Sequence, residues 1–372
     1  LSRVTVAMRS SQFAPPMTHT QPPGSPRDVH AHGESPRADT RWACPSCAAE
    51  LVPGEQAWGC TGCGRDYAVV AGIPDLRLSY QDPYVSRQED LERARELEAM
   101  FDARDLLGLL EEHWRRSGKP PELAARFLAG DRVAAARSAS YLDAVERHRG
   151  APLGAGDAVL EVGCGTAALA AAAAERTGAA IATDISMRWL VLAKKRLAEL
   201  GIEGVELVCC NAEQPPFPEA AFTLVVAGDV IEHVGDQRRF SEACARILAP
   251  GGVLFLATPN RFSLSLEPHV RLWGVGYLPR RLARRYVQAV RHAPYDHVRL
   301  LSSRALRRML RAAGVDPVIE APDIPPATRA TYSGLEGRLI DVYNRARRLA
   351  AVRRLLLAVG PFFHVFATKG RP

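Results

Sequence analysis

A short apolar run that ends in glycines constrains this chain more than any other stretch. Val159, Leu160 and Val162 favour a buried parallel strand, and Gly163 and Gly165 follow at once. Glycines tolerate positive φ and carry no Cβ, so a ligand can approach the backbone of such a turn. The alanine-rich segment that follows predicts a helix whose free N–H groups point at that ligand. An ordinary tight turn is the alternative, and the sequence downstream distinguishes the two.

Apolar strand-like runs alternate with helical patterns from residue 157 onward. This alternation predicts an α/β fold with a doubly wound, Rossmann-like sheet of seven strands. The predicted strands cover 158–162, 179–183, 205–209, 222–227, 252–258, 316–320 and 362–368. The predicted helices cover 166–177, 186–200, 237–248, 302–313 and 334–357. Ligands of such sheets bind beyond the carboxyl ends of the strands, so the residues after each strand are the candidate site.

Polar residues follow the predicted strands at those ends. Asp184 lies about twenty residues beyond the glycine turn, where an acidic side chain can accept hydrogen bonds from both hydroxyls of a ribose. A nucleoside is therefore implied. A dinucleotide-binding turn would have a third glycine, whereas this turn has Ala167 at that position. Glu161 lies inside the strand just before the turn. Further candidates follow the third, fourth and fifth strands: Asn211, Ala212, Glu213, Asp229, Glu232, His233, Thr258 and Asn260.

Five motifs in this order resemble those of S-adenosylmethionine-dependent class I methyltransferases. They are EVGCGT at 161–166, ATD at 182–184, NAEQPPF at 211–217, DVIEHV at 229–234 and LAPGG at 248–252. The resemblance covers 155–370 and implies that the two glycines line the methionine moiety, that Asp184 holds the ribose, and that Asn211 and Ala212 border the adenine. Asn211 departs from the family, which more often has aspartate there. The implied cofactor-binding residues are Glu161, Gly163, Cys164, Gly165, Asp184, Ile185, Asn211, Ala212 and Asp229.

The implied cofactor reacts by in-line displacement, for which the enzyme mainly orients two partners and excludes water. A hydroxyl acceptor must also lose a proton. His233 follows the fourth strand and is the candidate general base, with packing near the site as its alternative role. Because DVIEHV resembles the motif of coenzyme Q-type O-methyltransferases, we expect O-methylation of a small or carrier-linked metabolite. The alternatives are a guanine methyltransferase of ribosomal RNA and a non-catalytic scaffold that binds the cofactor.

Four cysteines form two CxxC pairs, Cys44 with Cys47 and Cys60 with Cys63. Two such knuckles supply four thiolates for a tetrahedral Zn²⁺ site, which would be structural because no coordination position stays open. A disulfide or a redox dithiol is the alternative. The segment 64–76 ends in GIPDL and resembles the zinc-ribbon module of the methyltransferase-activator type.

The sequence predicts four parts: a disordered leader over 1–41, a zinc-ribbon module over 42–80, a helical cap or linker over 86–150 and a methyltransferase domain over 151–372. Inside the last part, 260–300 is longer than an ordinary connection and carries aromatic residues and leucines, which predicts a substrate lid.

The net charge of +7 is unevenly placed, because twelve arginines face two acids between 261 and 315. This cluster predicts contact with a phosphate, a carboxylate or an acidic carrier protein, or less readily with RNA. A solvated face is the alternative. No apolar run reaches the roughly 18 residues of a membrane span, and the N-terminus has no signal-peptide core, so we expect a cytoplasmic protein.

Overall fold

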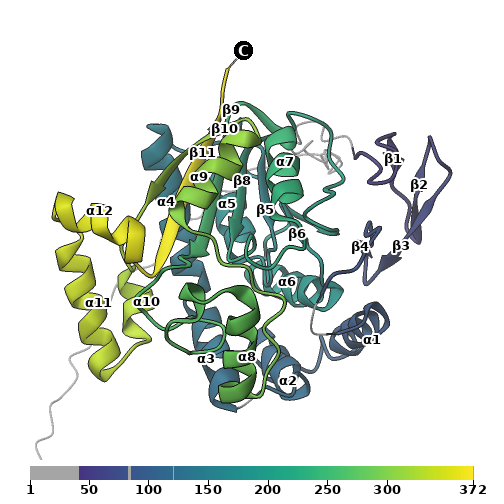
Figure 1. Ribbon diagram of the computed structural model, residues 1–372. Coiled ribbons are helices and arrows are strands. Elements are labelled where there is room, and N and C mark those ends of the chain that lie inside the picture. The colour runs from purple at the N-terminus through teal and green to yellow at the C-terminus, as the bar shows by residue number, and fades with distance from the viewer. Residues whose placement is uncertain (1–41, 83–84, 120, 372) are drawn as a thin grey trace, which may run out of the picture. The chain divides into compact units, whose positions relative to one another are not determined.

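The computed structural model describes residues 42–82, 85–119 and 121–371, and the leader expected over 1–41 lies outside them. The described chain holds a small sheet of four short strands, which comes first in the sequence, and a sheet of seven strands covered by helices (Figure 1).

The larger sheet consists of β5 (Val159–Val162), β6 (Ala180–Asp184), β7 (Val205–Cys209), β8 (Phe222–Gly228), β9 (Leu248–Pro259), β10 (Val315–Glu320) and β11 (Phe362–Lys369). Its order is β10-β11-β9-β8-β5-β6-β7, with β11 antiparallel to both of its neighbours. The predicted seven-stranded, doubly wound sheet is confirmed. The strand order reverses between β5 and β8, and ligands of such sheets bind at the carboxyl ends of the strands at this point.

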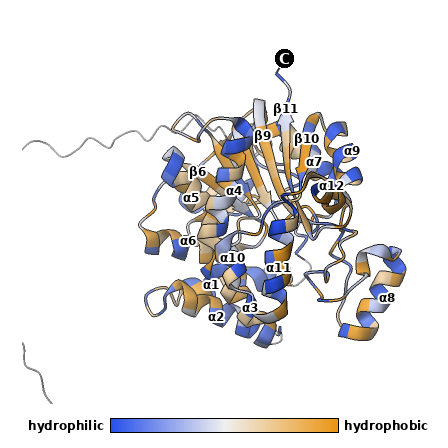
Figure 2. Cartoon of the chain, turned by 90° about the vertical axis from the view of Figure 1, so that its left-hand side faces the viewer, coloured by the Kyte–Doolittle hydropathy of each residue, from blue (hydrophilic) through white to orange (hydrophobic). Residues whose placement is uncertain are grey.

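Alternate side chains of the strands divide the core into two layers. Leu224 and Val226 belong to a layer with α4 (Ala134–Arg149), α5 (Ala168–Thr177) and α6 (Met187–Leu200). Val225 and Ala227 belong to a layer with α7 (Gln237–Ile247) and α9 (Ser303–Ala312). Because both faces of the strands are buried, their sequences are apolar almost throughout, as the orange strands of Figure 2 show.

Among the described residues, three helices precede α4: α1 (Arg87–Glu98), α2 (Leu106–Arg116) and α3 (Pro121–Arg132). Leu97 of α1 and Leu109 of α2 are buried in the same layer as α6. Glu199 near the end of α6 accepts a hydrogen bond from the N–H of Leu106 at 2.8 Å. These helices therefore thicken one face of the larger sheet. Among the described residues, no helix is both long and apolar enough to cross a bilayer.

The small sheet is an antiparallel meander of β1 (Leu51–Val52), β2 (Ala57–Cys60), β3 (Asp66–Val70) and β4 (Ile73–Pro74). Its tail continues the larger sheet, since Asp75 forms a parallel bridge with Cys209 and the N–H of Leu76 donates to the Cys209 carbonyl at 2.8 Å. Trp42 also packs on Phe217, with ring centroids 5.1 Å apart. The small sheet is thus attached at the β7 edge.

The predicted helix over 334–357 is wrong in one respect, because it is two helices, α11 (Gly334–Ala346) and α12 (Ala350–Val359). Leu349 between them has the extended backbone of φ −78° and ψ 126°. The helix predicted from 166 begins at Ala168, since Ala167 has a φ of 54°. Three further elements were not predicted from the sequence: η1 (Val275–Tyr277), α8 (Arg280–Arg291) and α10 (Pro326–Ala330).

Candidate cofactor and acceptor site

The glycine turn after β5 has a backbone that ordinary residues rarely adopt. Gly163, Gly165 and Ala167 have φ values of 68°, 52° and 54°. A Cβ at Gly163 would clash with Cγ2 of Val230, so this glycine admits the loop that follows β8. A Cβ at Gly165 would meet no atom within 4 Å. Gly165 is therefore the position where a ligand can approach the backbone.

Asp184 ends β6 and lies against this turn. Its Oδ2 accepts a hydrogen bond from the N–H of Gly165 at 3.0 Å, and its Oδ1 accepts one from the N–H of Ser186 at 2.9 Å. Burial raises the pKa of its carboxyl to about 6. Each carboxylate oxygen has further lone pairs for hydroxyl donors. The structure thus brings the predicted turn and the predicted acidic residue together.

Glu161 and Cys164 face the protein around the turn. Oε2 of Glu161 accepts a hydrogen bond from the N–H of Ala170 at 2.8 Å. Burial raises the pKa of this carboxyl to about 8, and the charge of Arg137 on α4 acts in the opposite direction. Cys164 is buried, and its N–H donates to the Thr183 carbonyl at 2.9 Å. Its peptide shapes the turn, whereas its thiol packs.

Asn211 follows β7 and is almost fully buried. Its Nδ2 donates to Oγ of Ser79 at 3.1 Å, and its Oδ1 accepts from the N–H of Glu213 at 2.9 Å. The carbonyl of Ile185, the residue after Asp184, accepts from Nη1 of Arg77 at 2.7 Å. Asn211 is therefore held by neighbours, and Oδ1 keeps one lone pair for a further hydrogen-bond donor.

A row of side chains lies beyond the carboxyl end of β8. Nε2 of His269 is 3.1 Å from Nε2 of His233, and Nδ1 of His269 is 2.5 Å from Oε1 of Glu267. Glu232 is fully buried and accepts a hydrogen bond from Oγ1 of Thr258 at 3.0 Å. Within the described part of the chain, Oε1 of Glu232 has no hydrogen-bond partner. The segment 260–300 therefore supplies half of this cluster.

The two imidazoles differ in proton affinity. Burial lowers the pKa of His233 to about 3, and the charge of His269 lowers it further in the same direction. Burial also acts to lower the pKa of His269, but the hydrogen bond and charge of Glu267 outweigh it and raise this pKa above its ordinary value. Burial raises the pKa of Glu232 to about 8. A proton given to the imidazole pair consequently resides on His269.

The same cluster is a candidate metal site. Glu232, His233 and His269 each offer one ligand atom, and these atoms lie within 4.8 Å of one another. A carboxylate and two imidazoles suit divalent transition metals such as Zn²⁺ or Fe²⁺. The geometry is thus compatible with proton transfer and with metal binding.

The segment 260–300 is ordered around a core of its own, formed by Leu272, Val275, Ala283, Val287, Tyr295 and Val298. Part of the predicted arginine cluster holds it together. Arg280 and Arg291 donate to backbone carbonyls of the same segment, and Arg284 pairs with Asp296 at 2.5 Å. These guanidinium groups serve the segment's own structure before any ligand.

Known proteins resemble the part of the chain that carries this site. A family model described as a methyltransferase domain matches residues 160–256. The ubiquinone biosynthesis O-methyltransferase of Azoarcus sp. is 31% identical over 179 residues, which cover 48% of this chain and 70% of that protein. This chain belongs to the S-adenosylmethionine-dependent methyltransferases.

Two further relatives match over shorter shares. The ubiquinone biosynthesis O-methyltransferase of Idiomarina loihiensis is 30% identical over 167 residues, 44% of this methyltransferase and 63% of the relative. A probable S-adenosylmethionine-dependent methyltransferase of Mycolicibacterium smegmatis is 35% identical over 115 residues, which cover 30% of this chain and 41% of the relative. These two matches span less than two thirds of the length of the relatives.

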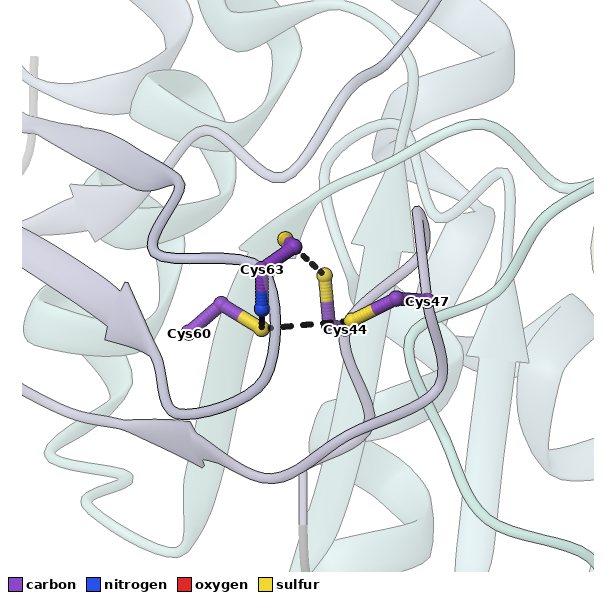
Figure 3. A group of neighbouring side chains, drawn as sticks. All are labelled: Cys44, Cys47, Cys60 and Cys63. Carbon is purple, nitrogen blue, oxygen red and sulfur yellow. Dashed lines mark hydrogen bonds between the residues drawn. The ribbon is translucent and has the colours of Figure 1, made fainter.

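The methyltransferase also gathers its four N-terminal cysteines (Figure 3). Sγ of Cys44 lies 3.9 Å from Sγ of Cys63, and Sγ of Cys47 lies 3.4 Å from Sγ of Cys60. Zn–S bonds of about 2.3 Å in a tetrahedron give S–S edges of about 3.8 Å. The hydroxyl of Tyr67 lies 3.1 Å from Sγ of Cys44, and a neighbour of this kind supports a ligating thiolate. The four side chains fit a zinc ion.

Some residues of the candidate site were not predicted from the sequence. Glu267 and His269 lay inside the predicted lid, where an acid and a histidine two residues apart in a long loop were the available signal. Tyr141 of α4 reaches the end of β8, within 3.6 Å of the Cβ position of Gly228. Ser79 gave no signal, because it touches Asn211 across 132 positions of the chain.

Proposed function

We propose that this methyltransferase transfers a methyl group to a hydroxyl oxygen of a small or carrier-linked metabolite. The row of Glu267, His269 and His233 carries the proposal, because it lies beside the loop that touches the glycine turn through Val230. Bound S-adenosylmethionine supplies an electrophilic methyl carbon on a sulfonium. The names of the ubiquinone biosynthesis relatives support oxygen as the acceptor atom.

For the cofactor, the geometry favours the assignments that follow from the motifs. The peptide at Gly165 lies open to the methionine side, and the carboxylate of Asp184 has lone pairs for the ribose. Ile185 and Asn211 border the adenine side. The full proposed set also includes Glu161, Gly163, Cys164, Ala212 and Asp229.

The proposed route for the proton of the acceptor hydroxyl runs through the two imidazoles. With Nδ1–H of His269 donating to Glu267, Nε2 of His269 accepts a hydrogen bond from Nε2–H of His233. Nδ1 of His233 is then the unprotonated nitrogen and takes the proton of the hydroxyl. His233 passes its Nε2 proton to His269, whose cation is stabilised by Glu267. A histidine with a low pKa can therefore serve as a base, since the charge does not stay on it.

We also propose that Cys44, Cys47, Cys60 and Cys63 bind one structural Zn²⁺. The sulfur spacing and the absence of an open ligand position support this role. Ribosomal RNA is the weaker acceptor candidate, because arginines of the 260–300 segment are used inside the protein. Salt-sensitive binding of ribosomal RNA in a filter assay would favour it instead.

Calorimetry with S-adenosylhomocysteine tests the cofactor site. The wild type should bind, and Asp184→Ala should weaken binding by about 10–100-fold, since hydrogen bonds to a charged group are lost. Asp316→Ala is the matched control, because Asp316 is an exposed carboxylate on β10. Absence of binding by the wild type, or unchanged binding by Asp184→Ala, would overturn the assignment.

A further inference from the structure

The linker between the small sheet and α1 carries a buried cluster of charges. Arg77 binds Asp75 through Nε at 2.6 Å and Asp90 through Nη1 at 2.7 Å, and the side chains of Arg77 and Asp90 are fully buried. Arg188 on α6 binds Asp90 at 2.7 Å and Asp82 at 2.5 Å. Charges of this kind are costly to bury unless each is paired, and here each one is.

These charges also hold the loop after Asp184. Nη1 of Arg77 donates to the Ile185 carbonyl at 2.7 Å, and Oγ of Ser186 donates to Oδ2 of Asp82 at 2.7 Å. Ser186 occupies the N-cap position of α6 but makes no side-chain cap hydrogen bond to the helix. The carboxylate of Asp90 provides the cap instead, because its Oδ2 accepts a hydrogen bond from the N–H of Met187 at 2.9 Å. A carboxylate from α1 therefore caps the helix that leaves the ribose loop.

The linker touches the adenine side at further points. Oγ of Ser79 accepts from Nδ2 of Asn211 at 3.1 Å, and Leu76 bonds to the end of β7. A Cβ at Gly235 would clash with the side chain of Gln81, so the linker also reaches the loop after β8. Residues 76–82 thus run past the carboxyl ends of three strands of the larger sheet.

The zinc-ligand region fixes where this linker begins. The N–H of Asp75 donates to the Ala68 carbonyl of β3 at 2.9 Å, and β3 carries Tyr67 beside Sγ of Cys44. Asp75 is therefore bonded to the strand whose Tyr67 contacts a cysteine of the four-cysteine site.

We infer that residues 75–82, together with Asp90 of α1, are a part of the cofactor site that lies outside the methyltransferase fold proper, and that they couple zinc ligation to cofactor affinity. Arg77 and Asp82 are positioning residues that act on the adenosine through Ile185 and Ser186, and Asp90 holds the next residue, Met187. Ser79 acts through Asn211. The inference rests on the proposed placement of the adenosine at those residues. Such coupling is reciprocal. Bound cofactor increases the affinity for zinc by the same factor by which bound zinc increases the affinity for the cofactor.

The test measures S-adenosylhomocysteine binding to the full chain by calorimetry. Asp82→Asn should raise the Kd by about 5–150-fold, the usual range of coupling between sites, and Ser79→Ala should raise it by a smaller factor. Arg87→Gln is the matched control, since Arg87 binds Asp75 at 3.0 Å in the same cluster without contacting the cofactor loop. Its Kd should stay at the wild-type value.

The reciprocal measurement needs no variant. Competition with a chromophoric chelator should show tighter zinc binding when S-adenosylhomocysteine saturates the protein, and this decides the matter if Asp82→Asn does not fold. Unchanged zinc affinity, or wild-type Kd values for both Asp82→Asn and Ser79→Ala, would overturn the inference. A wild type that does not bind S-adenosylhomocysteine would instead overturn the cofactor assignment itself.

Discussion

Nε2 of His269 lies 3.1 Å from Nε2 of His233, although 36 positions separate them in the chain. His233 follows a strand of the larger sheet, whereas His269 belongs to the segment 260–300. The imidazole pair therefore forms only when this segment is in place.

Replacing either imidazole should remove the proton route. We expect His233→Ala and His269→Ala each to lower kcat by about 10²-fold or more, as for loss of a general base, with little change in the Kd of S-adenosylhomocysteine. His292→Asn is the matched control, since this exposed histidine ends α8 in a left-handed conformation that asparagine also tolerates. Methyl transfer from labelled cofactor measures kcat, and wild-type turnover in His233→Ala would reduce His233 to a packing residue.

The pH dependence of kcat should follow the protonation state of His269. The relay needs a neutral His269, so kcat should rise as pH increases through the pKa of this residue, which Glu267 raises above its ordinary value. Glu267→Gln removes that effect, and burial then lowers the pKa of His269. The acidic limb should consequently move to lower pH while the maximal rate falls. An acidic limb that Glu267→Gln leaves in place would assign the titration to another group.

Metal content separates proton transfer from metal catalysis at this cluster. We expect about one equivalent of zinc per chain, all of it bound by the cysteines. His269→Ala should not change that value in elemental analysis. A second equivalent of divalent metal that disappears in His269→Ala would make Glu232, His233 and His269 a metal centre and replace the relay.

The cysteine site should be structural. Cys44→Ser should lose the zinc and make the 42–82 segment sensitive to limited proteolysis, because metal binding and folding of such small sites are linked. Cys244→Ser, at a buried cysteine of α7 far from the cluster in sequence, should keep its zinc. Full zinc occupancy in Cys44→Ser would exclude the assignment.

The sheet was predictable because its evidence is local. Buried parallel strands are nearly continuous apolar runs, and the glycine turn with Asp184 follows two of them at a fixed spacing. The motif around Glu232 and His233 could be placed at a strand end for the same reason. These features can be recognised from local sequence, without knowing which distant segments pack together.

The remaining parts of the site depend on tertiary contacts. Nothing near Asn211 in the sequence indicates Ser79, and no local pattern places Asp90 at the start of α6. The break at Leu349 lies next to a tertiary contact, in which Nε of Arg347 donates to the Ala321 carbonyl at 3.1 Å. Helical periodicity continues across this position, so the sequence favoured one helix.

The attachment of Asp75 and Leu76 to Cys209 has a consequence for solubility. β7 is an outer strand of the larger sheet, and unpaired strand edges template association between chains. The segment that carries the four cysteines bonds to this edge at Cys209 and packs Trp42 on Phe217. A chain starved of zinc should therefore aggregate before its larger sheet unfolds, which light scattering at mild chelator concentrations would register. Metal supply would then set how much enzyme survives in a cell as well as how well it works.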